Sequence, residues 1–581
     1  MKLSDYVIDF LVSQNIQYIF EVCGGAITHL LDSLYKRKDI STVSMHHEQA
    51  AAFAAEGYAR ASGHIGVAMA TSGPGATNLI TGIGNAFFDS TPCIFITGQV
   101  NTYEFKFNKP VRQIGFQETD IVKIIRPLVK EAILVTQPNK IRYYLEKAVF
   151  LAKSGRPGPV LLDIPMNIQR ADINPNLLKS YREPKVVQYI DTRLIKNIIR
   201  TLKEAQRPVI LAGGGVRVAN ACDVLLEFIR KTGIPVVTSL MGLDSIPHSG
   251  NYFVGMIGTY GNRYANLTIA NADLVLALGT RFDTRQTGTN TKTFAREAKI
   301  IHVDIDPREL NNKIKVDFAV NADVEKFLTV LNRQIKKFNK AKLLSWKKRI
   351  KEYKDKYPSY KNPTKDNIID PNFFIHTLSE YAPRGAIICV DIGQNQMWAA
   401  QSFKIKGSER FLTQGGMAAM GSVLSSAIGA SFAKPGKIIV AITGDGGFQL
   451  NVQELQTLYH HQLPIKIILL NNHCYGMVRQ FQKQYFAGRY QSTVIGYSEP
   501  DFQDLVSAYK IRATRIKHNR QIKRALKNIF HDTEPSFLEV DIKKGCMVLP
   551  KLAVNKPLED QDPYLTDDEF KANMIIKPLR A

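Results

Sequence analysis

The chain has 581 residues, 45% of them hydrophobic, which is enough apolar material for about three or four globular domains. Its 76 lysines and arginines exceed its 52 aspartates and glutamates, giving a formal net charge of +24. The excess is concentrated between Arg333 and Lys365, where thirteen basic residues face two acidic ones among several aromatic residues. Such a stretch could stack on nucleic acid bases, but its helical spacing between two domain-like blocks favours a solvated linker helix. Nucleic acid is therefore not expected as a partner.

The sequence also argues against a membrane or secreted protein. It contains no run of 18 apolar residues, and Asp5 and Asp9 stand where a signal peptide would be apolar. The six cysteines show no metal-binding spacing, which is typical of reduced thiols. We therefore expect a cytoplasmic protein with no membrane contact.

Strand and helix patterns alternate along most of the chain. This alternation predicts an α/β fold made of three doubly wound parallel-sheet domains. We expect a first domain at 1–166, a middle domain at 187–332, a basic linker at 333–368, a third domain at 369–548 and a C-terminal arm at 549–581.

In the first block, an expected strand at 42–47 runs through Glu48 into an alanine-rich helix at 49–61. Glu48 taken alone is most simply a helix-capping carboxylate, because a negative charge is favoured at the start of a helix. A second expected strand, 67–71, leads into a glycine-rich turn and then another helix.

In the middle block, an expected strand at 208–212 opens onto three glycines, 213–215. These glycines would let a diphosphate approach the backbone, and Asp304 or Asp306 at a later strand end could bind a ribose hydroxyl or an adenine edge. A triple glycine is more often a tight turn, and this one is not the GxGxxG fingerprint. Both interpretations remain open on these residues alone.

The third block holds the most informative motif. An expected strand at 438–442 ends in the glycine-rich run 444–447, and a second at 465–470 ends in two asparagines. Asp445 and Asn472 supply hard oxygen donors suited to a small divalent cation that bridges to a diphosphate. The glycines let backbone N–H groups approach phosphate oxygens at a helix start. A lone Gly-Asp-Gly would be interpreted as a turn, but the flanking strands and helix argue against a turn alone.

This pair of strand ends resembles the signature of the thiamine diphosphate enzymes. The resemblance implies that Asp445, Asn472 and the backbone carbonyl of Cys474 hold Mg²⁺, which in turn holds the diphosphate. Glu48 matches the family's activating glutamate, whose carboxyl group hydrogen-bonds the aminopyrimidine N1′ and promotes proton removal from the thiazolium. Further cofactor-binding positions implied by the resemblance are Pro74, Asn78, Gln394, Met420, Gly444, Gly446, Gly447 and Met477.

Nearly the whole chain resembles the acetohydroxyacid (acetolactate) synthase catalytic subunit, within the group that also includes pyruvate oxidase. This resemblance implies FAD in the middle domain and a homodimer or homotetramer in which Glu48 and the Asp445 motif meet across a subunit interface. A regulatory small subunit is a further possible partner. The positions implied for FAD are Arg156, Gly213, Gly214, Gly258, Thr259, Tyr260, Gly261, Arg281, Asp283, Asp304 and Asp306.

The activity implied is a decarboxylating carboligase: pyruvate loses CO₂, and its two-carbon unit adds to a second carbonyl, giving 2-acetolactate when the acceptor is pyruvate. Glu48, Gln117 and Arg281 are the implied catalytic residues, with Arg281 gripping the acceptor carboxylate through its forked donors. The implied substrate pocket consists of Phe116, Gln117, Met477 and Phe481.

Some positions depart from the synthase pattern. Phe481 replaces a Trp that favours 2-oxobutyrate as acceptor, Cys23 replaces a Pro, and Tyr260 and Asn395 each replace a His. Acceptor choice is therefore open, and the leading alternative is acetyl transfer to a nucleotide-linked keto-sugar in surface polysaccharide synthesis. An alternative of another class is an FAD-dependent pyruvate oxidase. A non-catalytic regulatory protein is disfavoured by the intact Glu48 and Asp445 motifs.

Overall fold

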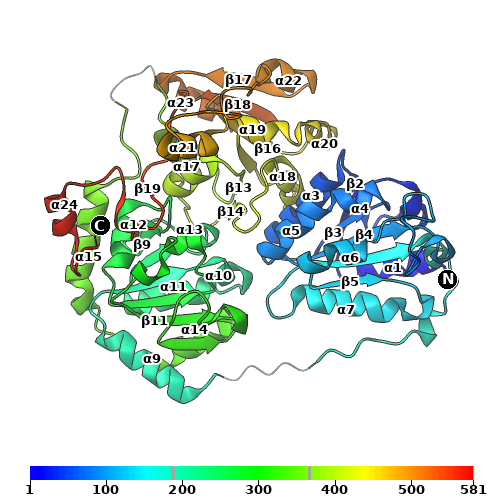
Figure 1. Ribbon diagram of the computed structural model, residues 1–581, viewed down its shortest axis with the longest axis horizontal. Helices are drawn as coiled ribbons and strands as arrows, with labels where there is room; N and C mark the ends of the chain where they lie inside the picture. The colour runs from blue at the N-terminus through cyan, green and yellow to red at the C-terminus, as the bar shows by residue number, and fades with distance from the viewer. Residues whose placement is uncertain (185–189, 364–367, 580–581) are drawn as a thin grey trace.

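The computed structural model describes residues 1–184, 190–363 and 368–579, which form three α/β domains (Figure 1). Each domain contains one six-stranded parallel sheet, so the predicted fold class is confirmed. Residue 187, the expected start of the middle domain, and part of the expected linker lie outside the described residues. None of the helices in these three described stretches is long and apolar enough to cross a membrane.

The N-terminal domain, blue to cyan in Figure 1, has the strand order β2-β1-β3-β4-β6-β5. Its strands are β1 (Tyr18–Val22), β2 (Ser41–Ser44), β3 (Gly66–Ala70), β4 (Cys93–Gln99), β5 (Glu131–Leu134) and β6 (Val160–Pro165). Its helices are α1 (Leu3–Ser13), α2 (Thr28–Leu34), α3 (Glu48–Ser62), α4 (Pro74–Asn78), α5 (Ile80–Phe88), α6 (Ile121–Ile125), α7 (Ile141–Lys153) and α8 (Met166–Gln169).

The third domain, yellow to orange, has the order β14-β13-β15-β16-β18-β17, which repeats the N-terminal order when each sheet is counted from its own first strand. Its strands are β13 (Ile387–Val390), β14 (Arg410–Leu412), β15 (Ile439–Gly444), β16 (Ile465–Asn471), β17 (Arg512–Ile516) and β18 (Ser536–Asp541). Its helices are α16 (Pro371–Tyr381), α17 (Gln394–Ser402), α18 (Val423–Ala433), α19 (Asp445–Gln449), α20 (Leu455–His460), α21 (Gly476–Tyr485), α22 (Phe502–Ala508) and α23 (Ile522–Ile529).

The middle domain, mostly green, has a different order, β12-β11-β10-β7-β8-β9. If β7 is numbered as strand 1 and the sheet is read from β9 to β12, the order is 3-2-1-4-5-6, which is the order of dinucleotide-binding sheets. Its strands are β7 (Pro208–Ala212), β8 (Val236–Thr238), β9 (Phe253–Met256), β10 (Leu274–Leu278), β11 (Lys299–Asp304) and β12 (Phe318–Asn321). Its helices are α9 (Thr192–Glu204), α10 (Gly214–Val218), α11 (Cys222–Thr232), α12 (Arg263–Ala270), α13 (Thr284–Thr287) and α14 (Val324–Gln334).

The basic stretch forms a helix, α15 (Leu344–Lys356), but the helix is not solvated on all sides as the sequence suggested. Trp346 and Tyr353 are 2% and 1% exposed and pack into the apolar core of the middle domain. The aromatic residues therefore form the buried face of an amphipathic helix, and the lysines cover its outer face. The helix itself was predicted from its spacing, but the burial of one face against the middle domain was not.

The end of the chain, red in Figure 1, also packs on the middle domain. Leu552 and Leu558 belong to the same core as α15, and Asn271 of the middle domain accepts a hydrogen bond from the backbone N–H of Ile575 (2.6 Å). This segment contains β19 (Lys551–Leu552), β20 (Gln561–Asp562) and α24 (Asp567–Asn573).

The N-terminal and third domains share one apolar core, at the crossing of α3 and α18. A Cβ atom on Gly57 would overlap the backbone of Ser426, and one on Gly429 would overlap the carbonyl of Ala54. Glycine at both positions therefore allows the two helix backbones to touch. This contact fixes how the two domains sit against each other within one chain.

Candidate active site

The Asp445 motif lies at the carboxyl edge of the third sheet. Strands β15 and β16 pair in parallel, with Gly444 opposite Leu470, so the residues that follow the two strands come together. Asp445 begins α19, and Asn472 comes one residue after β16. Both side chains are buried, at 2% and 5% exposure. This pairing agrees with the sequence-based prediction that the two strand ends lie close together.

Three oxygen atoms converge there. Asn472 Nδ2 donates to Gln394 Oε1 (2.6 Å), which turns Asn472 Oδ1 toward Asp445 Oδ1 and the Cys474 carbonyl oxygen, each 3.0 Å away. Without a cation the reversed amide would be preferred, because it would donate to both acceptors. Octahedral Mg²⁺ with bonds of about 2.1 Å places neighbouring oxygens about 3 Å apart. The donor set of one carboxylate, one amide and one carbonyl therefore fits magnesium.

The surroundings of Asp445 were not anticipated from the sequence. Its Oδ2 accepts hydrogen bonds from the Tyr497 hydroxyl (2.6 Å) and the Cys474 N–H (2.9 Å), which fixes the carboxylate orientation. Burial raises the pKa of Asp445 to about 7, and a bound cation would lower it by favouring the carboxylate. Tyr497 lies in an irregular segment, so no local pattern marked it.

His473, next to the motif, is held by two carboxylates. Its hydrogen bonds to Glu499 (2.5 Å) and Asp541 (3.1 Å) raise the pKa of the imidazole to about 9. This places a positive charge beside Asn472. This charge could not be predicted from the sequence, because Glu499 and Asp541 are distant from His473 along the chain.

The glycines of the motif are required by close packing. A Cβ on Gly447 would overlap Asp391 Oδ2 and would lie 3.4 Å from Met420 Cγ. Asp391 follows β13, and its two carboxylate oxygens accept from the N–H of Gly421 at 3.0 and 3.1 Å. Met420 is thereby held against the motif. Asp391 could have been identified from the sequence as a second acidic residue at a strand end.

Gln394 and Met477 also lie beside the motif. Gln394 begins α17 and bonds to Asn472, and a Cβ on Gly476 would overlap the Gln394 side chain. Gly476 begins α21, so Met477 lies in the first turn of that helix. The structure therefore gathers the predicted third-domain residues at one edge of the sheet.

Glu48 lies at the corresponding edge of the N-terminal sheet, at the first position of α3. Asn78 Nδ2 donates to its Oε2 (2.9 Å), while a Cβ on Gly75 would lie 3.4 Å from its Oε1. Glycine at 75 therefore keeps space beside this second oxygen. His47, the residue before the helix, accepts from the N–H of Gln49 and serves as the cap, so Glu48 is not needed for capping.

Gln117 and Phe116 lie near the same edge. Gln117 has a left-handed backbone (φ 63°) and contacts Gly73, where a Cβ would lie 3.1 Å from both Cβ and the carbonyl oxygen of Gln117. Phe116 is 87% exposed. Gly73 precedes Pro74, which begins α4, so the loop after β3 supports the segment that carries Gln117.

The N-terminal and third-domain groups do not bond to each other in the described part of the chain. Glu48 is hydrogen-bonded to Asn78 within its own domain, and Asp445 to Cys474 and Tyr497 within the third domain. Phe481, near the third-domain group, is 44% exposed. Within one chain, Glu48 and Asp445 are therefore oriented by different neighbours.

The predicted FAD glycines lie at the topological switch point of the middle sheet, between β7 and β10. Gly213 and Gly215 pack against the backbone of Gly279, where a Cβ on Gly215 would lie 2.6 Å from the Gly279 Cα. This close packing is by itself enough to explain why both positions are glycine. Two buried side-chain atoms nearby, Gln286 Nε2 and His302 Nδ1, have no hydrogen-bond partner among the described residues, as expected where a polar ligand is missing.

The remaining predicted FAD residues mostly bond to protein groups. Asp304, whose pKa burial raises to about 6, accepts from the N–H of Asp306 (2.9 Å). Arg156 of the N-terminal domain pairs with Glu309 of the middle domain (2.9 Å). Asp283 caps α13.

The turn at 258–261 is hydrogen-bonded to the backbone of α13. The Thr259 N–H donates to the Arg285 carbonyl (2.7 Å), and the Gly261 N–H donates to the Gly258 carbonyl (2.8 Å). Gly258 has φ 122°, and a Cβ there would overlap the Arg285 carbonyl, so this position requires glycine. Gly214 begins α10 and faces Met241.

Arg281 and Phe481, both predicted for the acceptor pocket, have different neighbours. Burial raises the pKa of Asp89, and the positive charges of Arg60 and Arg281 oppose that rise. Because Asp89 belongs to the N-terminal domain, Arg281 of the middle domain lies on the side that faces this domain. The cation beside Phe481 is Lys551, whose Nζ lies 5.5 Å from the ring centroid and donates to Gln484 Oε1. Tyr260 and Tyr485 also face Lys551 Nζ, at 6.0 and 5.6 Å.

Family models match all three domains. The model for the N-terminal TPP binding domain of thiamine pyrophosphate enzymes matches residues 1–124. The models for the central domain and the C-terminal TPP binding domain of the same enzymes match residues 195–331 and 391–540.

Similar curated proteins extend over nearly the whole chain. Acetolactate synthase 2 of Nicotiana tabacum, chloroplastic, is 37% identical over 96% of this chain and 85% of its own length. Acetolactate synthase 3 of Brassica napus, also chloroplastic, is 38% identical over 96% of this chain and 86% of its own length. The acetolactate synthase large subunit of Lactococcus lactis is 36% identical over 94% of each chain.

Proposed function

Because the chain belongs to the thiamine diphosphate-dependent enzymes and matches acetolactate synthases over nearly its whole length, we propose that it is a decarboxylating carboligase of the acetolactate synthase kind. It decarboxylates pyruvate and transfers the two-carbon unit to a second carbonyl, so that pyruvate as acceptor gives 2-acetolactate. Bound thiamine diphosphate supplies the nucleophilic carbon and the electron sink. The observation that carries the proposal is the full-length match together with the converged oxygens of Asp445, Asn472 and Cys474.

Glu48 is the group that holds a proton at the aminopyrimidine ring. Asn78 orients one carboxylate oxygen, and Gly75 keeps space beside the other, which is the oxygen offered to the ring nitrogen. A positioned proton-transfer group of this kind contributes about 10²-fold to 10⁴-fold to a rate.

Mg²⁺ is the proposed link between the third domain and the diphosphate. Asp445, Asn472 and the Cys474 carbonyl would provide three oxygen ligands, and the bound cation would offset the negative charge of the diphosphate. Gln394 and Tyr497 orient two of these ligands through hydrogen bonds.

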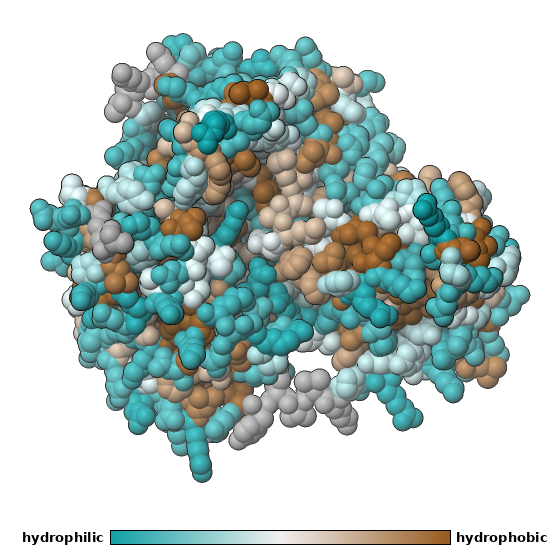
Figure 2. All heavy atoms as spheres, in the orientation of Figure 1, coloured by the Kyte–Doolittle hydropathy of each residue, from teal (hydrophilic) through white to brown (hydrophobic). Residues whose placement is uncertain are grey.

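The active unit is a homodimer, with a tetramer of two dimers as the alternative assembly. The support is that Glu48 and Asp445, which must reach one cofactor, are each hydrogen-bonded within a separate domain of the chain. Figure 2 shows brown, apolar surface over the N-terminal domain near α5, where Phe88 is 38% exposed. Such a surface suits burial against a second copy.

FAD is proposed for the middle domain. The support is its dinucleotide-type strand order, together with the unpaired Gln286 and His302 atoms near the switch point. A regulatory small subunit is a further proposal, motivated by the name large subunit that the Lactococcus lactis relative carries. A cytoplasmic location stays a prediction from the sequence.

The acceptor is pyruvate, with weak preference for 2-oxobutyrate. Phe481 offers less apolar contact than an indole to the extra methylene of 2-oxobutyrate, and such a contact is worth about 1–3 kcal/mol. The deciding experiment incubates the purified protein with thiamine diphosphate, Mg²⁺ and pyruvate, alone and with 2-oxobutyrate or nucleotide keto-sugars, and identifies the products.

Acetolactate from pyruvate alone supports the proposal, whereas product formed only with a keto-sugar assigns the acetyl-transfer reaction. FAD also makes a pyruvate oxidase a second candidate. Adding pyruvate without oxygen separates the two, because an oxidase would bleach the flavin stoichiometrically while a carboligase would leave it largely oxidised.

A further inference from the structure

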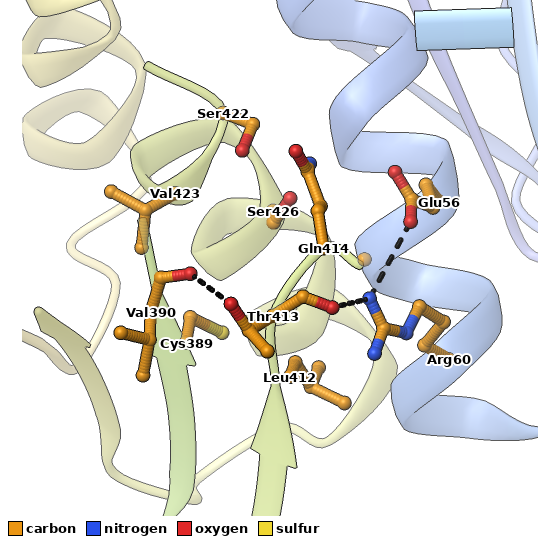
Figure 3. A pocket seen from close by; sticks show the side chains of 11 residues that line it. Glu56, Arg60, Cys389, Val390, Leu412, Thr413, Gln414, Ser422, Val423 and Ser426 are labelled. Atoms are coloured by element: carbon orange, nitrogen blue, oxygen red, sulfur yellow. Dashed lines mark hydrogen bonds and ion pairs between the residues drawn. The ribbon is translucent and has the colours of Figure 1, made fainter. Parts of the chain in front are cut away.

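A cluster of charged side chains joins the N-terminal domain to one loop of the third domain (Figure 3). Arg60 on α3 donates from Nη1 to the Thr413 carbonyl (2.6 Å), and the same nitrogen lies 3.5 Å from Glu56 Oε1. Asn85 on α5 donates to the other oxygen of Glu56 (3.1 Å). The guanidinium is therefore aimed at the backbone where β14 ends.

Asp89, directly after α5, holds the next two residues of that loop. Its Oδ1 accepts from the N–H of Gly416 (2.8 Å), and its Oδ2 accepts from the N–H of Gly415 (3.1 Å). Hydrogen bonds to a carboxylate are stronger than neutral ones. Arg60 and Asp89 together fix the backbone of residues 413–416 from outside its own domain.

The opposite end of this loop lies on the metal motif. The N–H of Gly421 donates to Asp391, and the Gly421 carbonyl accepts from Asn451 Nδ2 (2.9 Å). A Cβ on Gly421 would lie 3.1 Å from the Gly447 carbonyl, so the loop backbone is packed on the glycines next to Asp445. The segment 413–421 is thus anchored at its start by the N-terminal domain and at its end by the third domain.

We propose that Asp89 is a positioning residue for the cofactor, acting through the 413–421 loop. It does not touch the cofactor-binding motif itself. It sets where the loop that carries Met420 lies against Gly447, so the N-terminal domain shapes the diphosphate-binding site of its own chain. This inference deepens the proposed function, because it assumes that thiamine diphosphate binds beside Gly447.

The interface offers a matched control. Glu454 is also a buried carboxylate at the contact between these two domains, and its Oε1 accepts from the backbone N–H of His46 (2.9 Å). The side chain of Glu454 links His46 of the N-terminal domain to Thr457 in α20, and these bonds do not involve the 413–421 loop. A variant at Glu454 therefore weakens the same domain contact without releasing the loop.

The test compares Asp89→Ala and Asp89→Asn with Glu454→Gln. Each full-length protein is stripped of cofactor with a chelator, and thiamine diphosphate affinity is measured by calorimetry in saturating Mg²⁺, at a temperature well below unfolding. Asp89→Ala should raise the Kd for thiamine diphosphate roughly tenfold to a hundredfold, since two charge-assisted hydrogen bonds are lost. Asp89→Asn, which keeps one acceptor oxygen, should show a smaller increase.

Glu454→Gln should lower the unfolding temperature but leave the Kd within about twofold, which is the result that separates loop positioning from general weakening of the interface. Unchanged cofactor affinity in Asp89→Ala, or an equal rise in Glu454→Gln, would overturn the inference. Wild-type protein that binds thiamine diphosphate but forms no acetolactate would instead contradict the proposed function and leave the affinity comparison valid.

Discussion

At the scale of single residues, the roles of Glu48 and Asp445 follow from what holds each carboxylate. Asn78 orients Glu48 from one side, and Tyr497 orients Asp445 through its Oδ2. In both cases hydrogen bonds from the protein hold one oxygen, while the second oxygen faces Gly75 in Glu48 and Asn472 in Asp445. This arrangement suits one group for proton transfer and the other for a cation.

Glu48→Gln should keep the fold and bind thiamine diphosphate, while lowering turnover about 10²-fold to 10⁴-fold. The amide fills the same space and can still bond to Asn78, but it cannot hold a proton at the ring nitrogen as a carboxyl group does. Steady-state acetolactate formation measures the loss, and calorimetry checks cofactor binding. Near-normal turnover would remove Glu48 from the mechanism.

Asp445→Ala should abolish Mg²⁺-dependent retention of thiamine diphosphate, because a single carboxylate provides the only charged oxygen of the proposed donor set. The measurement is cofactor affinity with and without Mg²⁺. Asp541→Asn, which alters a carboxylate on the far side of His473, is the matched control and should keep the Mg²⁺ dependence. Equal affinity of wild type and Asp445→Ala in Mg²⁺ would contradict the ligand assignment.

Arg281→Gln should reduce acetolactate formation while sparing the first decarboxylation, if Arg281 binds the carboxylate of the acceptor. Decarboxylation can be followed separately as CO₂ release with an artificial electron acceptor. The position of Arg281 toward Asp89 makes a second readout necessary, namely bound FAD. Loss of both half-reactions to the same extent with FAD still bound would show that Arg281 does not act on the acceptor.

At the scale of elements, sequence periodicity predicted the buried strands and the helix α15, but not that one face of this helix is buried. The strand before Asp445 and the strand before Asn472 are continuous apolar runs, as expected for a parallel sheet covered on both faces. The helix at 344–356 was expected to be solvated because it is rich in basic residues, but Trp346 and Tyr353 form a buried stripe. A few large aromatic residues at helical spacing outweighed many charges.

The crossing of α3 and α18 depends on glycine. Gly429→Val should lower the free energy of unfolding by about 1–3 kcal/mol or more, since the added carbons overlap the Ala54 carbonyl and force the helices apart. Gly25→Val, at a position with open space around its Cβ, is the control. Thermal unfolding of the two variants gives the comparison, and equal unfolding temperatures would show that the helices do not need this close approach.

At the scale of the whole molecule, one chain carries the two halves of the proposed site in two different domains. The N-terminal and third sheets have the same strand order, and each has one of the two proposed functional carboxylates at its carboxyl edge. A two-fold arrangement would place Glu48 of each copy against the Asp445 motif of the other. Each dimer would then hold two equivalent sites.

Mixing two inactive variants tests this arrangement. Glu48→Gln and Asp445→Ala, unfolded and refolded together or co-expressed, should regain about a quarter of wild-type activity, because half of the dimers are mixed and each has one intact site. The variants mixed without subunit exchange are the control. If co-expressed mixed dimers have no more activity than the separate variants, the site is not shared between chains.

The sequence by itself determined the alternation of strands and helices, the three-sheet architecture and the Asp445 and Glu48 motifs. Each of these features depends on residues that are neighbours in the chain. The sequence also placed Asp445 and Asn472 together, since consecutive parallel strands end at one edge. Only the tertiary structure decided which distant groups complete the site. Tyr497 on Asp445, and Asp89 on the Gly415–Gly416 backbone, are brought together by packing between segments and domains. No local pattern encodes such contacts, because they depend on how whole sheets and helices fit against each other.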